Sequence, residues 1–94
     1  MIKHVVCFKL NEGESPEKAK EVLLSMQGNV PMLRGIEVGI DCLRSHRSYD
    51  VILSVILDDM NALTEYQDDA YHVGVVKKHM HAVTKTSVSV DFEI

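Results

Sequence analysis

The chain has no tryptophan, two prolines and two cysteines, and aromatic residues make up only 5% of its 94 positions. Cys7 and Cys42 are isolated, with neither a CxxC motif nor the spacing of a disulfide framework. We therefore expect two reduced thiols in a fold stabilised by its apolar core. Hydrophobic residues, at 46% of the chain, suffice for one small domain spanning residues 1–94.

Basic stripes and long apolar runs are also missing. The formal net charge is -4, which argues against a nucleic-acid partner. No apolar run approaches the roughly 18 residues that a membrane span needs, and Lys3 and His4 interrupt the N-terminus where a signal peptide would lie. We expect a cytoplasmic protein without membrane association.

What is present is a clear hydrophobic periodicity. Apolar residues alternate with a period of two in four stretches and recur at helical spacing in two others. Ser15-Pro16 and Asp58-Asp59 are typical helix starts, and Asp68-Asp69 interrupts the second helical region. The predicted strands are residues 2–10, 36–40, 49–57 and 87–94, and the predicted helical regions are 15–28 and 58–83.

The resulting order, βαββαβ, predicts an α+β fold of the ferredoxin-like type. Two right-handed crossovers place both helical regions on one face of a four-stranded antiparallel sheet, with the first and third strands central. One strand phase, which includes His4, then faces the helices. The opposite phase carries Val5, Cys7, Ile52 and Ile56, with Ser54, Ser87 and Ser89 as smaller neighbours. Nothing in the chain remains to cover this second apolar face, so we expect a homodimer through it.

Several segments, in this order, resemble the stress-responsive dimeric α/β-barrel family over nearly the whole chain. The resemblance implies two chains whose sheets pack into a barrel. It rests on Ile2-Lys3-His4-Val5-Val6-Cys7-Phe8-Lys9-Leu10, Val38-Gly39-Ile40-Asp41, Tyr49-Asp50-Val51, Tyr66 followed by His72-Val73-Gly74-Val75-Val76, and Val90-Asp91-Phe92.

Plant cyclases of that family close a polyketide ring by an aldol-type reaction, without metal or organic cofactor. Their pocket lies between sheet and helices and uses a tyrosine and a histidine of the helical region and a histidine of the first strand. The matching positions are Tyr66, His72 and His4. The resemblance therefore implies acid-base chemistry in which His72 is the base, Tyr66 stabilises an enolate oxygen and His4 orients or donates. The chain departs from the family's usual His-Pro, with Asp69-Ala70-Tyr71 before His72.

We interpret the space between sheet and helices as a ligand cavity, because medium or small apolar side chains face it. The candidate ligand-binding residues are Val6, Phe8, Leu53, Val75 and Val76. A small apolar or carbonyl-containing ligand fits such a lining. Three functions remain open: ligand binding without turnover, a cofactor-independent cyclase, isomerase or lyase, and a structural assembly unit.

Metal binding is not expected, although the chain has five histidines. His79 and His81 are two residues apart and point to opposite sides of a helix, and no i, i+4 histidine pair occurs. We interpret the basic cluster of the second helical region as a solvated helix face, with an anionic ligand edge as the alternative. It comprises Lys77, Lys78, His79, His81 and Lys85.

Overall fold

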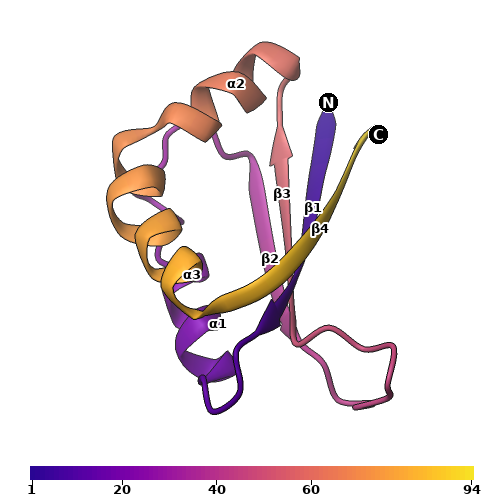
Figure 1. Ribbon diagram of the computed structural model, residues 1–94. Coiled ribbons are helices and arrows are strands. Elements are labelled where there is room, and N and C mark those ends of the chain that lie inside the picture. Colours follow the sequence, from indigo (N-terminus) through magenta and orange to yellow (C-terminus); the bar gives the residue numbers. More distant parts are fainter.

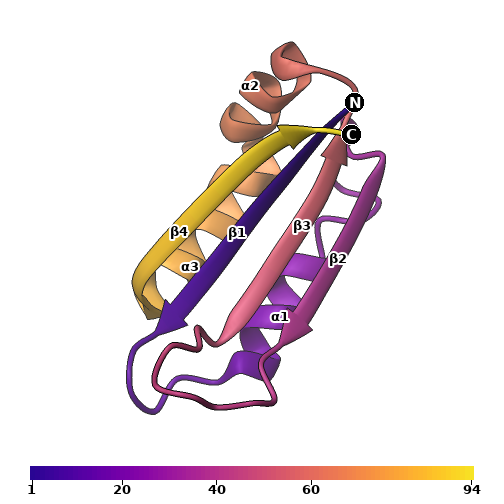
Figure 2. The same cartoon turned by 90° about the vertical axis from the view of Figure 1, so that its right-hand side faces the viewer.

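The computed structural model describes all 94 residues as an antiparallel sheet with helices against one face (Figure 1). The elements are β1 (Ile2–Leu10), α1 (Pro16–Leu24), β2 (Gly35–Ile40), β3 (Val51–Leu57), α2 (Met60–Asp68), the π-helical segment η1 (His72–Lys77), α3 (Lys78–Val83) and β4 (Thr84–Glu93). The strands pair in the order β2-β3-β1-β4. Figure 2 shows the sheet's second face with every helix behind it. The predicted ferredoxin-like order and the central strands β1 and β3 are confirmed.

Local sequence signals explain where the helices begin. The Ser15 hydroxyl accepts the Lys18 amide hydrogen at 3.0 Å, and Pro16 occupies the first helical position of α1. The Asp59 carboxylate accepts the Ala62 amide hydrogen at 2.8 Å and starts α2. None of the helices has the length and apolar character needed to cross a membrane.

The second helical region departs from expectation after its break. The sequence predicts ordinary helical spacing from His72, but η1 forms a six-residue π-helix before α3 begins. Glycine and β-branched residues favour the α-helix least among non-proline residues, and η1 contains both in Val73-Gly74-Val75. The chain here therefore gains less from α-helical geometry than it would in an alanine- or leucine-rich segment.

The buried core lies between the sheet and the helices, in the strand phase that the sequence assigns to it. The most deeply buried large side chains are Tyr66, Leu23, Met26, Leu53, Leu57, Val55 and Val76. Val6 and Phe8 share this phase of β1 but are only half-buried. Their register neighbours on β4 are Ser89 and Ser87, whose small side chains leave space beside them.

The second face of the sheet is more apolar than the sequence analysis expects. Register pairs Cys7 with Val88 and Val5 with Val90, so β4 adds its apolar residues to this face. Ser87 and Ser89 lie on the helical side, and their assignment to the second face was wrong because the β1–β4 register was unknown. The resulting outer face consists of Val5, Cys7, Ile52, Ile56, Val88, Val90 and Phe92, and four of these, Ile52, Val88, Val90 and Phe92, are 44–64% exposed.

We expect a second copy of the chain to cover the outer face, and Ile52→Asp to dissociate the pair because it places a charge in the apolar contact. Light scattering at micromolar concentration should give twice the 10.6 kDa chain mass for the unmodified protein and 10.6 kDa for the variant. Val75→Asp is the matched control, since Val75 is 43% exposed against 44% for Ile52 but lies on the helical layer. A mass of 10.6 kDa for the unmodified protein would contradict the expectation.

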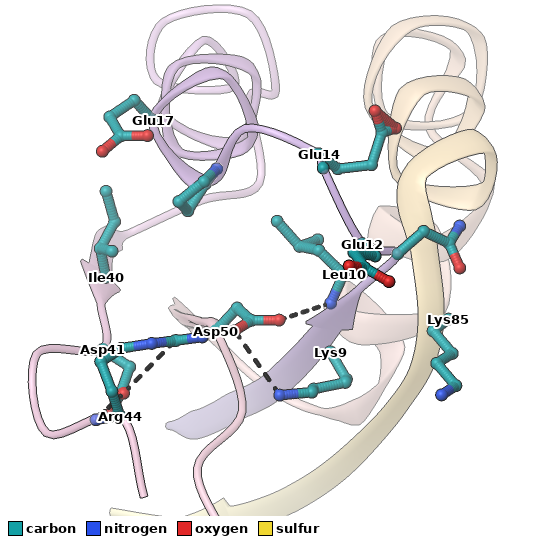
Figure 3. A pocket seen from close by; sticks show the side chains of 13 residues that line it. Lys9, Leu10, Glu12, Glu14, Glu17, Ile40, Asp41, Arg44, Asp50 and Lys85 are labelled. Atoms are coloured by element: carbon teal, nitrogen blue, oxygen red, sulfur yellow. Dashed lines mark hydrogen bonds and ion pairs between the residues drawn. The ribbon is translucent and has the colours of Figure 1, made fainter.

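Asp50 fastens the end of β1 to the start of β3 (Figure 3). Its carboxylate accepts the Leu10 amide hydrogen at 2.7 Å and a guanidinium hydrogen of Arg44 at 2.8 Å, with the Lys9 ammonium 3.8 Å away. Arg44 has a φ of 58°, in the left-handed region, within the loop that returns to β3. β3 begins at Val51 rather than at the predicted residue 49, and the Asp50 amide still donates to the Phe8 carbonyl oxygen at 2.8 Å.

Asp50 borders a hollow of ≈ 610 Å³, which we call the charged cavity. Burial by itself raises the pKa of Asp50, but the hydrogen bond from Leu10, that from Arg44 and the Lys9 charge together hold this pKa below its ordinary value. The ionisable side chains that line the charged cavity are Lys9, Glu12, Glu14, Glu17, Asp41, Arg44, Asp50 and Lys85.

Asp50→Asn should lower the free energy of unfolding by about 1–3 kcal/mol at pH 7, because a buried amide hydrogen loses a charged acceptor. The contribution of Asp50 is present above the ordinary aspartate pKa of about 3.9 and is lost as the pH falls toward its lower folded pKa. Urea unfolding at one protein concentration should therefore show the difference at pH 7 and little of it at pH 2. Asp68→Asn, at an exposed carboxylate, should change stability by less than about 0.5 kcal/mol. Equal stability of Asp50→Asn and unmodified protein at pH 7 would contradict the prediction.

Candidate functional site

A cavity of ≈ 260 Å³ opens between the helical layer and the half of the sheet formed by β1, β3 and β4. We call it the histidine cavity. Its walls are apolar on the sheet and core sides, and polar side chains gather along the helices and β4. The lining residues are His4, Val6, Phe8, Leu23, Leu53, Tyr66, Gln67, His72, Val76, Lys77, Met80, His81, Thr84, Ser87 and Ser89.

The structure brings most of the sequence candidates together here. His4, Tyr66 and His72 line the cavity, as do the four apolar candidates Val6, Phe8, Leu53 and Val76. Val75 does not line it: its side chain is 43% exposed, and its placement among the cavity residues was wrong. Successive helical residues point in different directions, so Val75 and Val76 do not share one face.

The Tyr66 ring contacts both histidines. It stacks on the ring of His72, with centroids 4.1 Å apart, and meets that of His4 edge-on at 5.8 Å. The side chain is fully buried, and its hydroxyl donates to the Met26 sulfur at 3.7 Å. Burial raises the pKa of the Tyr66 hydroxyl well above its ordinary value. The ring thus packs against both imidazoles, and the hydroxyl is hydrogen-bonded to a core residue outside the cavity lining.

His72 is held with one ring nitrogen free. Its Nδ1 lies 2.8 Å from the Tyr66 carbonyl oxygen, which can only accept, so Nδ1 carries the hydrogen and Nε2 the lone pair. Asp69 accepts the amide hydrogens of Tyr71 and His72 at 3.0 Å, and so fixes the start of the helix where the family usually has His-Pro. Burial is the main cause that lowers the pKa of His72, so the ring is neutral at pH 7.

His4 has a carboxylate partner that the sequence analysis missed. Its Nδ1 hydrogen-bonds to the Asp91 carboxylate on the neighbouring strand. The β1–β4 register places Asp91 directly opposite His4. Asp91 belongs to the polar side of β4. Without the register, such a polar side is expected to face solvent. The signal that could have found it is the pair of acidic residues, Asp91 and Glu93, on that side of a strand expected to flank the first strand.

The Nε2 atoms of both histidines remain accessible. Neither has a hydrogen-bond partner, and Thr84 Oγ1 is the only buried side-chain nitrogen or oxygen without one. The two Nε2 atoms are therefore reached by solvent, although each residue is only 7% exposed. Two imidazoles in contact with one aromatic ring can thus present a proton acceptor and, when protonated, a donor to a molecule in the cavity.

Part of the basic cluster also belongs to the cavity. The interpretation of this cluster as a solvated helix face holds for Lys78, which is exposed. Lys77 and His81 instead line the cavity. The π-helical geometry of η1 causes the difference: residues five apart lie about 140° apart around an α-helix, whereas the wider π-turn brings them closer to one face. Lys77 donates to the Gln67 carbonyl oxygen at 2.9 Å.

The histidine cavity is smaller than the charged cavity, yet it is the better candidate. The carboxylate of Asp50 in the charged cavity is already paired with Leu10, Arg44 and Lys9, and no imidazole lines that hollow. Pocket size alone does not mark chemistry, whereas titratable groups among apolar walls do. No group of three or more His, Cys, Asp or Glu side chains is arranged to hold a metal ion.

Solved structures with the same architecture come from several organisms. A dimeric protein of unknown function from Bacteroides fragilis is 22% identical, with a TM-score of 0.85 over 99% of this chain and 95% of its own. An Arabidopsis thaliana protein is 21% identical, with a TM-score of 0.81 over 100% and 95%. A hydroxynitrile lyase from Passiflora edulis is 12% identical, with a TM-score of 0.77 over 99% and 92%.

No curated protein matches the chain in sequence. The family model of the stress-responsive A/B barrel domain matches residues 2–94. This match covers every strand and helix described above, and with them His4, Tyr66 and His72. The chain belongs to the stress-responsive A/B barrel domain family.

Proposed function

We propose that the histidine cavity binds a small, largely apolar carbonyl compound and transfers a proton next to its carbonyl group. One observation carries the proposal: His4 and His72 both contact the Tyr66 ring, each with Nδ1 engaged by an oxygen and Nε2 accessible. The chemistry belongs to a cofactor-independent lyase, isomerase or cyclase. Ligand binding is its first step and is also the function that remains if no turnover follows.

His72 is the proton acceptor in this proposal. Its neutral ring offers the Nε2 lone pair, because the Tyr66 carbonyl holds the hydrogen on Nδ1. The proton leaves the carbon next to the carbonyl for Nε2, and the electron pair of that C–H bond moves into the enolate and onto the carbonyl oxygen. The apolar walls strengthen the electrostatic interactions of the charges that form.

His4 is the donor to the developing oxygen anion. In the protonated ring, Nδ1 donates to Asp91 and Nε2 donates to the oxygen, while the carboxylate stabilises the imidazolium charge. Reprotonation of the enolate at another carbon gives an isomerase. Attack of the enolate on a second carbonyl gives a cyclase, and expulsion of a leaving group gives a lyase.

Tyr66 has a positioning role in this proposal. Its hydroxyl donates to Met26, so the oxygen anion receives its hydrogen bond from His4 rather than from the phenol. The stacked ring fixes the plane of His72 and limits the movement of His4. This differs from the sequence-based hypothesis, in which the Tyr66 hydroxyl stabilises the enolate.

The structural neighbours support the proposal in two respects. A hydroxynitrile lyase and an antibiotic biosynthesis monooxygenase have this architecture, so the fold accommodates small-molecule chemistry. The neighbours from Bacteroides fragilis, Thermobifida fusca and Jannaschia are described as dimeric, which agrees with a homodimer through the outer face. An assembly unit without chemistry is the alternative if no ligand enters the cavity.

His72→Ala should abolish proton transfer. Exchange of the α-hydrogens of 2-octanone in D₂O, followed by NMR, should be accelerated by the unmodified protein and fall by about 10²–10⁴-fold in the variant. His79→Ala is the matched control, because His79 does not line the cavity. No acceleration by the unmodified protein, or equal rates for the two variants, would overturn the proposal.

The pH profile of exchange should follow the His72 base. Since its pKa lies below the ordinary histidine value of about 6.5, the neutral form of the ring predominates at pH 6.5. The acid limb of the His72-dependent rate should therefore have its midpoint below pH 6.5. If the exchange rate already fell between pH 8 and pH 7, the base would be a group other than His72.

Tyr66→Phe should leave the exchange rate within a few-fold of the unmodified protein, because the ring that stacks on His72 remains. Tyr66→Leu removes the ring and should lower the rate more than it lowers the affinity for 2-octanone. Circular dichroism checks that both variants fold. A large loss of rate in Tyr66→Phe would show that the Tyr66 hydroxyl takes part in the reaction.

A further inference from the structure

Lys77 is a half-buried ammonium without a counter-ion. None of the ion pairs of the molecule includes it, and its only hydrogen bond runs to the Gln67 carbonyl oxygen at 2.9 Å. An ammonium has three donor hydrogens, so two remain for another partner. A hydrogen bond from an ammonium to an anion is stronger than one to a neutral acceptor. The Lys77 ammonium can therefore bind an anion that the chain itself does not supply.

The histidine cavity is where that anion would lie. Lys77 lines it, and no aspartate or glutamate does. His81 lines the cavity four residues after Lys77, on the same side of the helical layer. Thr84, the first residue of β4, also lines the cavity, and its hydroxyl, buried and without a partner in the protein, is a further donor there.

We propose that Lys77 selects ligands with a carboxylate, and that the substrates are aliphatic oxo acids. The carboxylate lies against the Lys77 ammonium, the carbonyl lies near His72 and His4, and the alkyl chain lies along Val6, Phe8 and Leu53. The carbonyl part of this assignment rests on the proposed function, whereas the acid preference rests on Lys77 alone.

The relation between Lys77 and His72 supports a carboxylate close to the reacting carbon. Burial is the main cause that lowers the pKa of His72, and the positive charge of Lys77 lowers it further, which shows that the charge acts at the imidazole. The π-helical turns of η1 bring the two residues toward one face. A bound carboxylate would neutralise the Lys77 charge and make His72 a stronger base only when an acid is present.

The test compares octanoate with octanamide, which have the same length and differ in charge. NMR titration of the full chain should show octanoate binding about ten-fold more tightly, as a charge-assisted hydrogen bond in a partly dry site allows. Lys77→Met should remove this preference, and Lys77→Arg should keep it. Lys78→Met is the matched control: it removes the same charge one residue away, at an exposed position outside the cavity lining.

Equal affinity for octanoate and octanamide, or an equal loss in Lys77→Met and Lys78→Met, would overturn the inference. The inference would also be overturned if neither octanoate nor octanamide bound. Thermal unfolding followed by circular dichroism confirms that the variants compared are folded, and Lys77→Arg reports on charge even where Lys77→Met unfolds. If octanoate binds through Lys77 while 2-octanone shows no exchange, the acid preference stands and the proposed proton transfer fails.

Discussion

The register of β1 between β3 and β4 is the constraint on which both faces of the molecule depend. It sets His4 opposite Asp91 on the helical side and Cys7 opposite Val88 on the other. Because side chains alternate along a strand, a slip by one residue would exchange the two sets. The histidine would then lie on the outer face, and the apolar residues of that face would lie in the cavity. Asp50, bonded to the last residue of β1, helps to prevent such a slip.

The histidine cavity exists because one part of the sheet is left underpacked. β3 contributes Leu53 and Val55 to a fully packed core, whereas β4 contributes Ser87 and Ser89 to the same side of the sheet. Filling this space with larger apolar side chains would bury more surface and add stability. The chain instead places two imidazoles there, at a desolvation cost that their hydrogen bonds to Asp91 and to the Tyr66 carbonyl offset in part.

The sequence was sufficient for those features that depend on periodicity. Alternation along residues 2–10 and 49–57 assigns the two strand faces, and together with the family resemblance it places His4, Tyr66 and His72 at one end of the helical layer. Asp91 escaped prediction because cross-strand partners follow from register, which no local pattern encodes. The direction of Lys77 within the basic cluster escaped prediction because it depends on whether the helix is of α or π type.

The number of residues in the π-helical segment determines which side chains face the core and which face the cavity. From His72 to His81, Val76 and Met80 pack into the core and border the cavity from that side, while Lys77 and His81 line the cavity without belonging to the core. Shortening this segment by one residue would let it close as an α-helix but would rotate one of these sets by about 100° relative to His72. A single-residue deletion could therefore exchange the cation beside the base for another side chain while the packed face stays in place. Relatives that differ by one residue here would share a fold and a histidine yet differ in the ligands they select.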